Sequence, residues 1–219
     1  ALLIVHLYGL PCDMDKILSI CKKNKIHLIE DCAQSHFSKY KGKNVGNFGI
    51  ASAFSFFPTK TLGAFGDAGC IITNNKTIEK KARLIANNGK KNNREFINQG
   101  INSRMDTLQA LILSKKLDNT HQEIIKKRRN VLIYKNELKK SKFLSHIEIP
   151  NHKLSTFYVF TIRIKKFRNE LRSWLLKNNI ETGIYYDFVL PHTKLYLKTN
   201  YKTKNFKQSK INSVETLSL

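Results

Sequence analysis

The sequence predicts an α/β domain with a mostly parallel sheet, followed by a small α+β domain. In the first half, short apolar runs alternate with segments of helical period, a pattern typical of parallel strands joined by helices. The second half begins with a long stretch, from Asp106 to about Lys140, that contains no Pro or Gly. We therefore assign residues 1–115 to part of a large domain, and residues 116–219 to a bridging helix and a small C-terminal domain.

Four short segments of the first half have the composition of strands. They are rich in aliphatic and aromatic residues and are bounded by polar or turn-forming residues. These segments are LLIVHL (2–7), HLIED (27–31), SAFSFF (52–57) and GCIITN (69–74). The second strand ends in two carboxylates, and Pro58 stops the third before a Gly-rich loop.

Two segments between these strands show the helical period. MDKILSICKKN (14–24) follows Asp13, a candidate N-cap, and IEKKARLIANNG (78–89) is expected to close on Gly89. A third segment, YKGKNVGNFG (40–49), has the residues of a hairpin loop.

The spacing of apolar residues in the second half predicts one long or broken helix over Asp106 to about Lys140, an element that commonly bridges domains. A strand, FYVFTIRI (157–164), an amphipathic helix, RNELRSWLLKNN (168–179), and a short strand, TGIYY (182–186), follow. We expect them to form a small antiparallel α+β domain.

The composition indicates a folded chain. Its 219 residues are 41% hydrophobic and 10% aromatic, enough to bury a core. Apolar runs such as ALLIV and ASAFSFF are too short to span a bilayer. No charged region precedes ALLIV and the chain does not begin with Met, so we expect no signal peptide and an N-terminal truncation.

The four cysteines, Cys12, Cys21, Cys32 and Cys70, have neither C-x-x-C spacing nor a histidine at metal-ligand distance in the sequence. We expect reduced thiols, no metal site and a cytoplasmic location.

The chain is strongly basic, with 39 Lys and Arg against 16 Asp and Glu and a formal charge of +23. The cations are dispersed along the chain rather than gathered into one tract or interleaved with aromatic residues. Dispersion favours a solvated basic surface over a dedicated nucleic-acid site, and it is compatible with attraction for an anionic nucleotide.

A carboxylate and a lysine follow two of the predicted strands. Asp31 ends one strand and Lys60 lies just beyond another, so both are expected at the carboxyl edge of the sheet, where open α/β sheets bind ligands. Lys60 lies between Pro58 and a run of glycines, and enclosure by backbone favours the neutral amine that imine formation needs. Sequence spacing alone leaves open a solvated surface lysine.

Five motifs occur in a fixed order over much of the chain: VHLYGLPCDMDKI, LIEDCAQSH, YKGKNVGNFG, FSFFPTKTLGAFGDAG and GINSRMDTLQA. With these motifs the chain resembles the DegT/StrS-type sugar-nucleotide aminotransferases, which depend on pyridoxal phosphate (PLP). The resemblance implies the large domain of a fold-type-I PLP-dependent transferase plus a small C-terminal domain, incomplete at both ends.

The resemblance also implies roles for five residues. Lys60 would form the Schiff base with PLP, and Asp31 would accept a hydrogen bond from the protonated pyridine nitrogen. Gln34 would approach the phenolic oxygen of the cofactor, and Ser55 would bind its phosphate. Asn102 would reach the phosphate in the neighbouring subunit, so the active site would be shared within a homodimer.

Other polar residues have structural interpretations. On a regular strand Glu30 points away from Asp31, so we expect it to be structural or a salt-bridge partner. His6 and His36 are expected to be satisfied core or rim residues. Lys41 and Lys43 are expected on a solvated hairpin. Asp67 is expected to shape the loop after Lys60.

The sequence also departs from the family pattern. The upstream third, which supplies a phosphate-binding turn and a ring that stacks on the cofactor, does not precede ALLIVHLYG. In two later strands where the family often has His, this chain has FYVF and IYYD, so Tyr158 and Tyr185 are expected to replace it.

The reaction implied is a ping-pong transamination. An amino acid, usually glutamate, gives its amine to the cofactor, with free Lys60 as proton shuttle, and a 3- or 4-keto deoxysugar nucleotide then receives the amine for surface-glycan or amino-sugar biosynthesis. The word TKTLGAFGDAG is nearer to members that use 3-keto sugars. Lys60 argues against a PLP-dependent dehydratase, because those relatives typically have His. Two alternatives stay open: an inactive fragment, and a regulatory or nucleic-acid-binding protein on the same scaffold.

Overall fold

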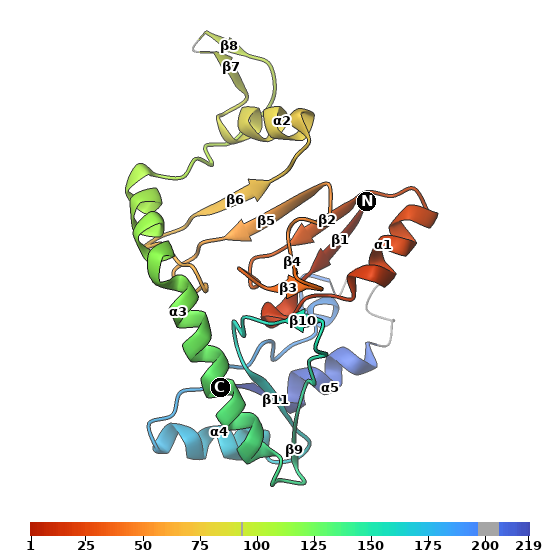
Figure 1. The fold of residues 1–219 in the computed structure, drawn as a ribbon, viewed down its shortest axis with the longest axis vertical. Helices are drawn as coiled ribbons and strands as arrows, with labels where there is room; N and C mark the ends of the chain where they lie inside the picture. The colour runs from red at the N-terminus through yellow and green to blue at the C-terminus, as the bar shows by residue number, and fades with distance from the viewer. Residues whose placement is uncertain (93, 197–205) are drawn as a thin grey trace. The chain divides into compact units, whose positions relative to one another are not determined.

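A computed structural model describes residues 1–92, 94–196 and 206–219 (Figure 1). The chain divides into two compact units. Unit 1 comprises Ala1–Arg128 and Ile149–Tyr158, and unit 2 comprises Arg129–Glu148 and Val159–Leu219. The division falls within one long helix, so the predicted boundary after residue 115 stays a prediction. Among the described residues, no helix combines the length and apolar composition needed to cross a membrane.

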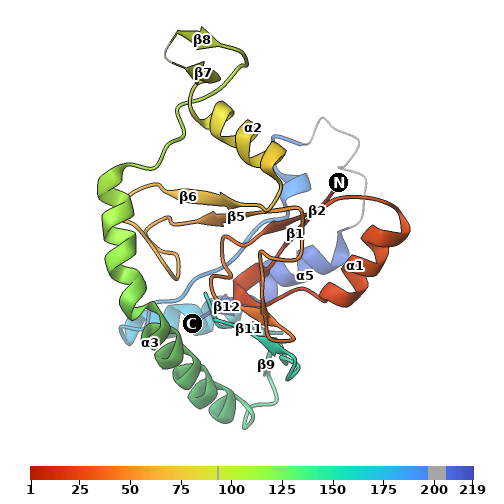
Figure 2. The same cartoon turned by 45° about the horizontal axis from the view of Figure 1, so that its top comes forward.

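The main sheet of unit 1 contains all four predicted strands. They are β1 (Leu2–Val5), β2 (Leu28–Asp31), β5 (Ala51–Ser55) and β6 (Gly69–Ile72), in the order β1-β2-β5-β6 (Figures 1 and 2). β1, β2 and β5 are parallel, whereas β6 pairs antiparallel with β5. The prediction of a mostly parallel sheet is confirmed.

The register of these strands assigns their side chains to two faces of the sheet. Val5 lies opposite Asp31, and Asp31 lies opposite Ala53. Because successive side chains alternate, Asp31 and Ser55 belong to one face and Glu30 and Ser52 to the other. We call these the open face and the buried face, because Asp31 and Ser55 are partly accessible whereas Glu30 and Ser52 are buried.

Helix α1 (Met14–Lys23) packs against the buried face. The core there consists of Ile4, Met14, Cys21, Leu28 and Tyr40.

The predicted cap residue Asp13 occupies the N-cap position of α1, but its side chain does not cap the helix. It accepts a hydrogen bond from Tyr40 Oη at 3.0 Å and pairs with Lys16 Nζ at 3.1 Å. By contrast, Asn75 caps α2 (Lys76–Ala86) by accepting from two backbone N–H groups.

Gly89 closes the end of α2 as predicted. Its N–H donates to Leu84 O at 2.8 Å, and its φ of +72° suits glycine.

The predicted hairpin is also present. β3 (Lys39–Tyr40) and β4 (Lys43–Asn44) are antiparallel and joined by Lys41 and Gly42, both at positive φ. β10 (Lys153–Leu154) pairs with β3. The sequence did not predict the short 3-10 helix η1 (Leu7–Gly9) or the hairpin of β7 (Lys90–Asn92) and β8 (Glu95–Phe96).

Helix α3 (Thr107–Leu138) is one continuous helix, which begins in unit 1 and ends in unit 2. Unit 2 has an antiparallel sheet in the order β12-β11-β9, as predicted for an α+β domain. Its elements are β9 (Leu144–His146), β11 (Thr161–Ile164), α4 (Arg168–Lys177), η2 (Leu190–His192), α5 (Lys207–Glu215) and β12 (Thr216–Ser218).

Two strand predictions in this region need correction. TGIYY forms only a single bridge, between Gly183 and Ser218, because β12 occupies the edge of β11. FYVFTIRI is a strand only from Thr161 to Ile164, because backbone groups just before it bond to the turn at Tyr8 and Gly9 instead of a neighbouring strand.

Candidate active site

The two adjacent carboxylates at the end of β2 have different surroundings. Glu30 is fully buried and accepts four hydrogen bonds. Its Oε2 accepts from His6 Nε2 at 3.0 Å and Gly46 N at 2.8 Å, and its Oε1 accepts from Phe48 N and Gly49 N, both at 2.7 Å. Burial would raise the pKa of Glu30, but these hydrogen bonds hold it below its ordinary value. The structural role predicted for Glu30 is confirmed.

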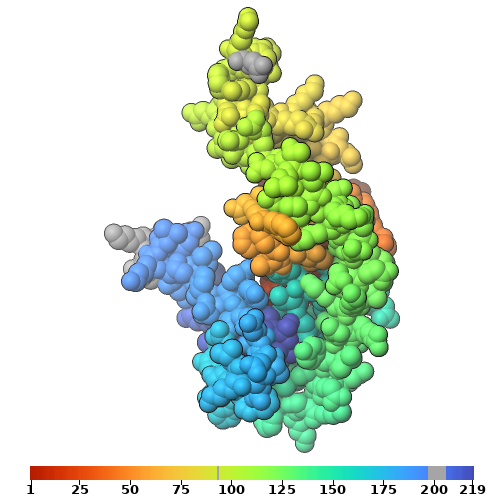
Figure 3. Space-filling model, turned by 90° about the vertical axis from the view of Figure 1, so that its left-hand side faces the viewer, coloured from red at the N-terminus to blue at the C-terminus, as the bar shows by residue number. Residues whose placement is uncertain are grey.

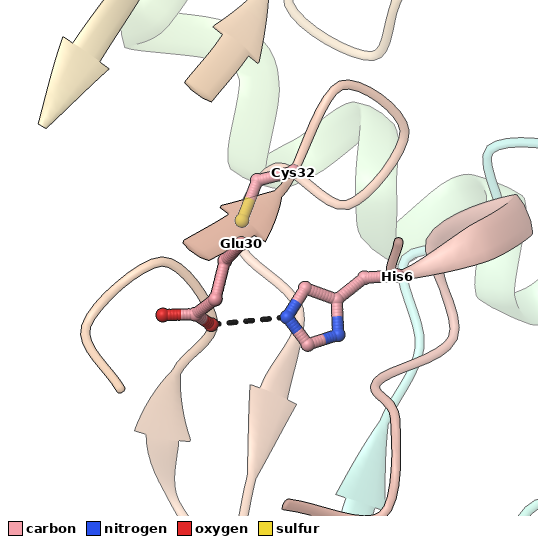
Figure 4. A group of neighbouring side chains, drawn as sticks. All are labelled: His6, Glu30 and Cys32. Atoms are coloured by element: carbon pink, nitrogen blue, oxygen red, sulfur yellow. Dashed lines mark hydrogen bonds and ion pairs between the residues drawn. The ribbon is translucent and has the colours of Figure 1, made fainter. Parts of the chain in front are cut away.

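His6 completes this buried centre. Its Nδ1 accepts from Cys12 N at 3.0 Å, so the ring proton is on Nε2 and is donated to Glu30. Figure 4 shows the ring facing the carboxylate, with Cys32 beside them. The prediction that His6 is a satisfied core residue is confirmed.

The ligand atoms of His6, Glu30 and Cys32 lie within 4.8 Å of one another, close enough to suggest a metal site. Both Glu30 oxygens and both His6 nitrogens are already hydrogen-bonded. Burial, and next the charge of Glu30, raises the pKa of the Cys32 thiol to about 12, which keeps it protonated. The cluster is therefore a hydrogen-bonded centre of the fold.

A hollow of about 590 Å³ lies at the end of β5. It brings together three of the predicted site residues, Ser55, Lys60 and Asn102, from one chain. The complete lining is Ser55, Phe57, Lys60, Asp67, Ala68, Asn102, Ser103, Arg104 and Met105. Its size is in the range of small-molecule sites.

The loop that carries Lys60 is fixed at both ends. Lys60 N donates to Phe57 O at 2.8 Å, and Ala64 N donates to Phe56 O at 2.8 Å. A Cβ on Gly63 would lie 2.4 Å from Pro58 O, so this close turn requires glycine.

Helix α3 holds the far side of the same loop. Lys116 Nζ donates to Gly63 O at 2.7 Å, and Phe65 N donates to Gln109 Oε1 at 2.8 Å. In Figure 3 the orange loop lies against the green helix. A rigid support of this kind fixes the backbone from which Lys60 projects.

Four polar groups of the hollow can bind an anion, although the carboxylate of Asp67 also belongs to the lining. Ser55 Oγ accepts from Phe57 N at 3.3 Å, which leaves its O–H to donate. Asn102 Oδ1 accepts from Arg104 Nε at 3.2 Å, which leaves its NH₂ to donate. With the Arg104 guanidinium and the Lys60 amine, these groups fit the phosphate and the aldehyde of a PLP-type cofactor. Arg104 was missed in the sequence, although it belongs to the motif GINSR.

Asp31 and Gln34 do not line this hollow. Asp31 lies on the open face, as Ser55 does, and its Oδ1 accepts from Ala33 N at 2.9 Å. Gln34 Oε1 accepts from Tyr8 N at 2.7 Å. The cofactor roles of both residues stay predictions.

Asp67 does line the hollow, and its predicted effect on the loop stays a prediction. Lys41 and Lys43 are exposed on the β3–β4 hairpin, where Lys41 pairs with Asp15 at 2.5 Å, so the solvated hairpin is confirmed.

His36 is buried, with 3% of its surface exposed. Its ring lies 5.4 Å from that of Phe54 and 5.6 Å from that of Phe56. The buried position of His36 agrees with the prediction of a core residue. Among the described residues, neither ring nitrogen has a hydrogen bond of good geometry, although the backbone of Ser55 interacts with the ring, so the predicted satisfied histidine is not observed. Burial, and next the charge of Lys60, lowers the pKa of His36 to about 4, so its ring is neutral at pH 7.

Of the two tyrosines expected to replace histidines, Tyr158 contacts Lys60, whose Nζ lies 4.8 Å from the centre of the ring. Tyr185 belongs to unit 2. All four cysteines are free, as predicted.

Comparison with known proteins identifies a family and several relatives. The DegT/DnrJ/EryC1/StrS aminotransferase family matches residues 1–219. A pleiotropic regulatory protein of Geobacillus stearothermophilus is 36% identical, over 100% of this chain and 59% of its own length. A dTDP-3-amino-3,6-dideoxy-alpha-D-galactopyranose transaminase of Aneurinibacillus thermoaerophilus is 37% identical, over 88% of this chain and 52% of its own length. The chain thus spans between half and three-fifths of these relatives.

Comparison with solved structures also finds aminotransferases. DesV of S. venezuelae, in complex with a ketimine intermediate, has a TM-score of 0.93 and 29% identity over 99% of this chain and 58% of DesV. NtdA of Bacillus subtilis, with bound cofactor PMP, has a TM-score of 0.83 and 26% identity over 99% of this chain and 51% of NtdA. Members of the family depend on PLP. The chain belongs to the DegT/DnrJ/EryC1/StrS aminotransferase family.

Proposed function

We propose that the protein containing this chain is a PLP-dependent aminotransferase that transfers an amine, with glutamate as donor, to a 3- or 4-keto deoxysugar nucleotide. Surface-glycan or amino-sugar biosynthesis would use the product. The observation that carries the proposal is the convergence of Lys60, Ser55 and Asn102 on one hollow, in a chain of this family. Several relatives are named as sugar-nucleotide transaminases, against one named as a regulatory protein, and this favours transamination over a regulatory or nucleic-acid-binding role.

Four residues of the hollow, together with Asp31 outside it, have tasks in this proposal. Ser55, Asn102 and Arg104 donate hydrogen bonds to the cofactor phosphate, and the Lys60 amine holds the aldehyde carbon. Asp31 keeps a proton on the pyridine nitrogen. When bound, PLP supplies an electron sink for the carbon that loses its proton. The free Lys60 amine takes up and returns that proton.

We further propose a cytoplasmic homodimer with a shared site, in which Asn102 also serves the neighbouring subunit. The four free thiols agree with a reducing compartment. Within one chain Asn102 lines the hollow with Lys60, and in the proposed dimer it would reach the cofactor phosphate of the neighbouring subunit.

The decisive experiment is borohydride reduction of the full-length protein after incubation with PLP, followed by peptide mass mapping. We expect a pyridoxyl adduct on Lys60, and its loss in Lys60→Arg but not in Lys41→Arg, a control on the solvated hairpin. An adduct on another lysine, with Lys60 unmodified in a folded protein, would overturn the proposal.

A further inference from the structure

Tyr158 contacts the reactive lysine from a distant part of the sequence. Lys60 Nζ lies 4.8 Å from the centre of the Tyr158 ring. Tyr158 Oη lies 3.4 Å from Oγ1 of Thr59, the residue just before Lys60. The ring and the hydroxyl of Tyr158 therefore both face the Lys60 loop. Tyr158 and Lys60 belong to unit 1.

The position of the ring is fixed by backbone contacts rather than by the ring itself. Tyr158 N donates to Tyr8 O at 3.1 Å, and Thr156 N donates to Gly9 O at 3.3 Å. Gly9 has a φ of +85°, and a Cβ there would lie 2.9 Å from Tyr158 N. Ser38 Oγ also donates to Gly9 O, at 2.7 Å. Only glycine permits this close docking.

The same turn also binds a residue of the predicted cofactor set. Tyr8 N donates to Gln34 Oε1 at 2.7 Å. Contacts therefore run from Gln34 through Tyr8 and Tyr158 to Lys60. Although Gln34 does not line the hollow, it supports the turn that places a ring over the lysine.

An aromatic ring interacts differently with the protonated and the neutral form of an amine above it. The negative face of the ring attracts an ammonium group and gains little from a neutral amine. Lysine has a flexible four-carbon stem, which without such a contact samples many rotamers. The ring therefore orders Lys60 in its free, protonated form.

We propose that Tyr158 is a positioning residue that holds the free Lys60 ammonium at the hollow between covalent steps. This inference rests on the proposed function, because it assumes that Lys60 alternates between a covalent bond and a free amine. The aromatic ring, not the hydroxyl, carries the effect.

The test measures how fast Lys60 of the cofactor-free, full-length protein reacts with acetic anhydride, which attacks neutral amines, with peptide mapping of every lysine. In Tyr158→Leu and Tyr158→Met we expect labelling of Lys60 to rise about 2- to 5-fold, the factor for a cation–π contact at a partly exposed site. Tyr158→Phe keeps the ring, so its Lys60 should be labelled at the wild-type rate. In the PLP-loaded enzyme, kcat should fall in Tyr158→Leu and Tyr158→Met and stay at the wild-type value in Tyr158→Phe. KM should be unchanged in all three variants.

A matched control uses the second exposed hairpin, where Lys90 Nζ lies 5.2 Å from the ring of Phe96. Phe96→Leu should raise labelling of Lys90 and leave Lys60 unchanged. Unchanged labelling of Lys60 in both Tyr158→Leu and Tyr158→Met, with Lys90 responding in the control, would overturn the inference. A wild-type protein that captures PLP on another lysine would instead overturn the proposed function.

Discussion

Two adjacent carboxylates of β2, Glu30 and Asp31, face opposite sides of one sheet and have opposite hydrogen-bonding states. Glu30 is buried and accepts four hydrogen bonds, whereas Asp31 is half-buried and accepts one described bond, from Ala33 N. A carboxylate whose acceptor sites are filled by the chain has little capacity left for a ligand. The buried face of the sheet thus stabilises the fold, and the open face keeps polar groups available for chemistry.

The largest difference in the free energy of unfolding is expected when each carboxylate of the pair is replaced by the corresponding amide. Glu30→Gln places an NH₂ group against backbone N–H donors and removes a buried charge that four donors stabilise, so it should lower the free energy of unfolding by about 3 kcal/mol. Asp31→Asn loses no buried network and should change it by less than about 0.5 kcal/mol. Urea denaturation measures both.

The same pair separates stability from cofactor binding. Asp31→Asn should release PLP more readily, because an amide does not hold the proton on the pyridine nitrogen. Equal losses of stability in the two variants would contradict the division between the faces.

An effect of similar size, but confined to acid pH, is expected from the buried side chain of His36. Because its pKa is about 4 in the folded protein and 6.5 in the reference state, the unfolded chain binds the proton first as pH falls. Stability due to the neutral ring is fully present above pH 6.5 and decreases by about 3 kcal/mol as pH falls to about 4.

His36→Phe isolates this contribution. The variant keeps the contacts with Phe54 and Phe56 and removes the titrating group, so it should be at least as stable as the wild type at pH 7. Its advantage should grow from pH 6.5 to pH 4. Glu30 and His6 are present in both proteins, so the difference between the two unfolding curves reports the loss of His36. Parallel curves over this range would show that its pKa is not lowered.

Local patterns in the sequence predicted much of this arrangement. The four strands, the hairpin and helix α3 follow from apolar periodicity and turn residues, and the alternation along β2 assigned Glu30 and Asp31 to opposite faces. Lys60 was identified because an ordered set of motifs surrounds it. Each of these features depends on neighbouring residues in the chain.

Contacts between distant residues could not be predicted in this way. The docking of Tyr158 depends on Gly9, in a turn far upstream, and nothing in FYVFTIRI shows that its first residues bond to that turn. Similarly, the sequence around His36 does not reveal that its nitrogens lack hydrogen bonds of good geometry, because Phe54 and Phe56 come from another strand and loop.

The smallest changes in binding and stability are expected from substitutions of two serines of β5. One serine lies on the open face and the other on the buried face, so the pair tests the same comparison. Ser55→Ala removes a donor from the hollow and should weaken PLP binding about 10-fold, with a stability change below about 0.5 kcal/mol. Ser52 is buried on the other face, and its Oγ donates to Gly46 O at 2.9 Å. Ser52→Ala should leave PLP binding unchanged and lower the free energy of unfolding by about 1–2 kcal/mol. Fluorescence titration with PLP and urea denaturation measure the two quantities. If Ser52→Ala weakened PLP binding as much as Ser55→Ala, the faces of the sheet would not be functionally separate.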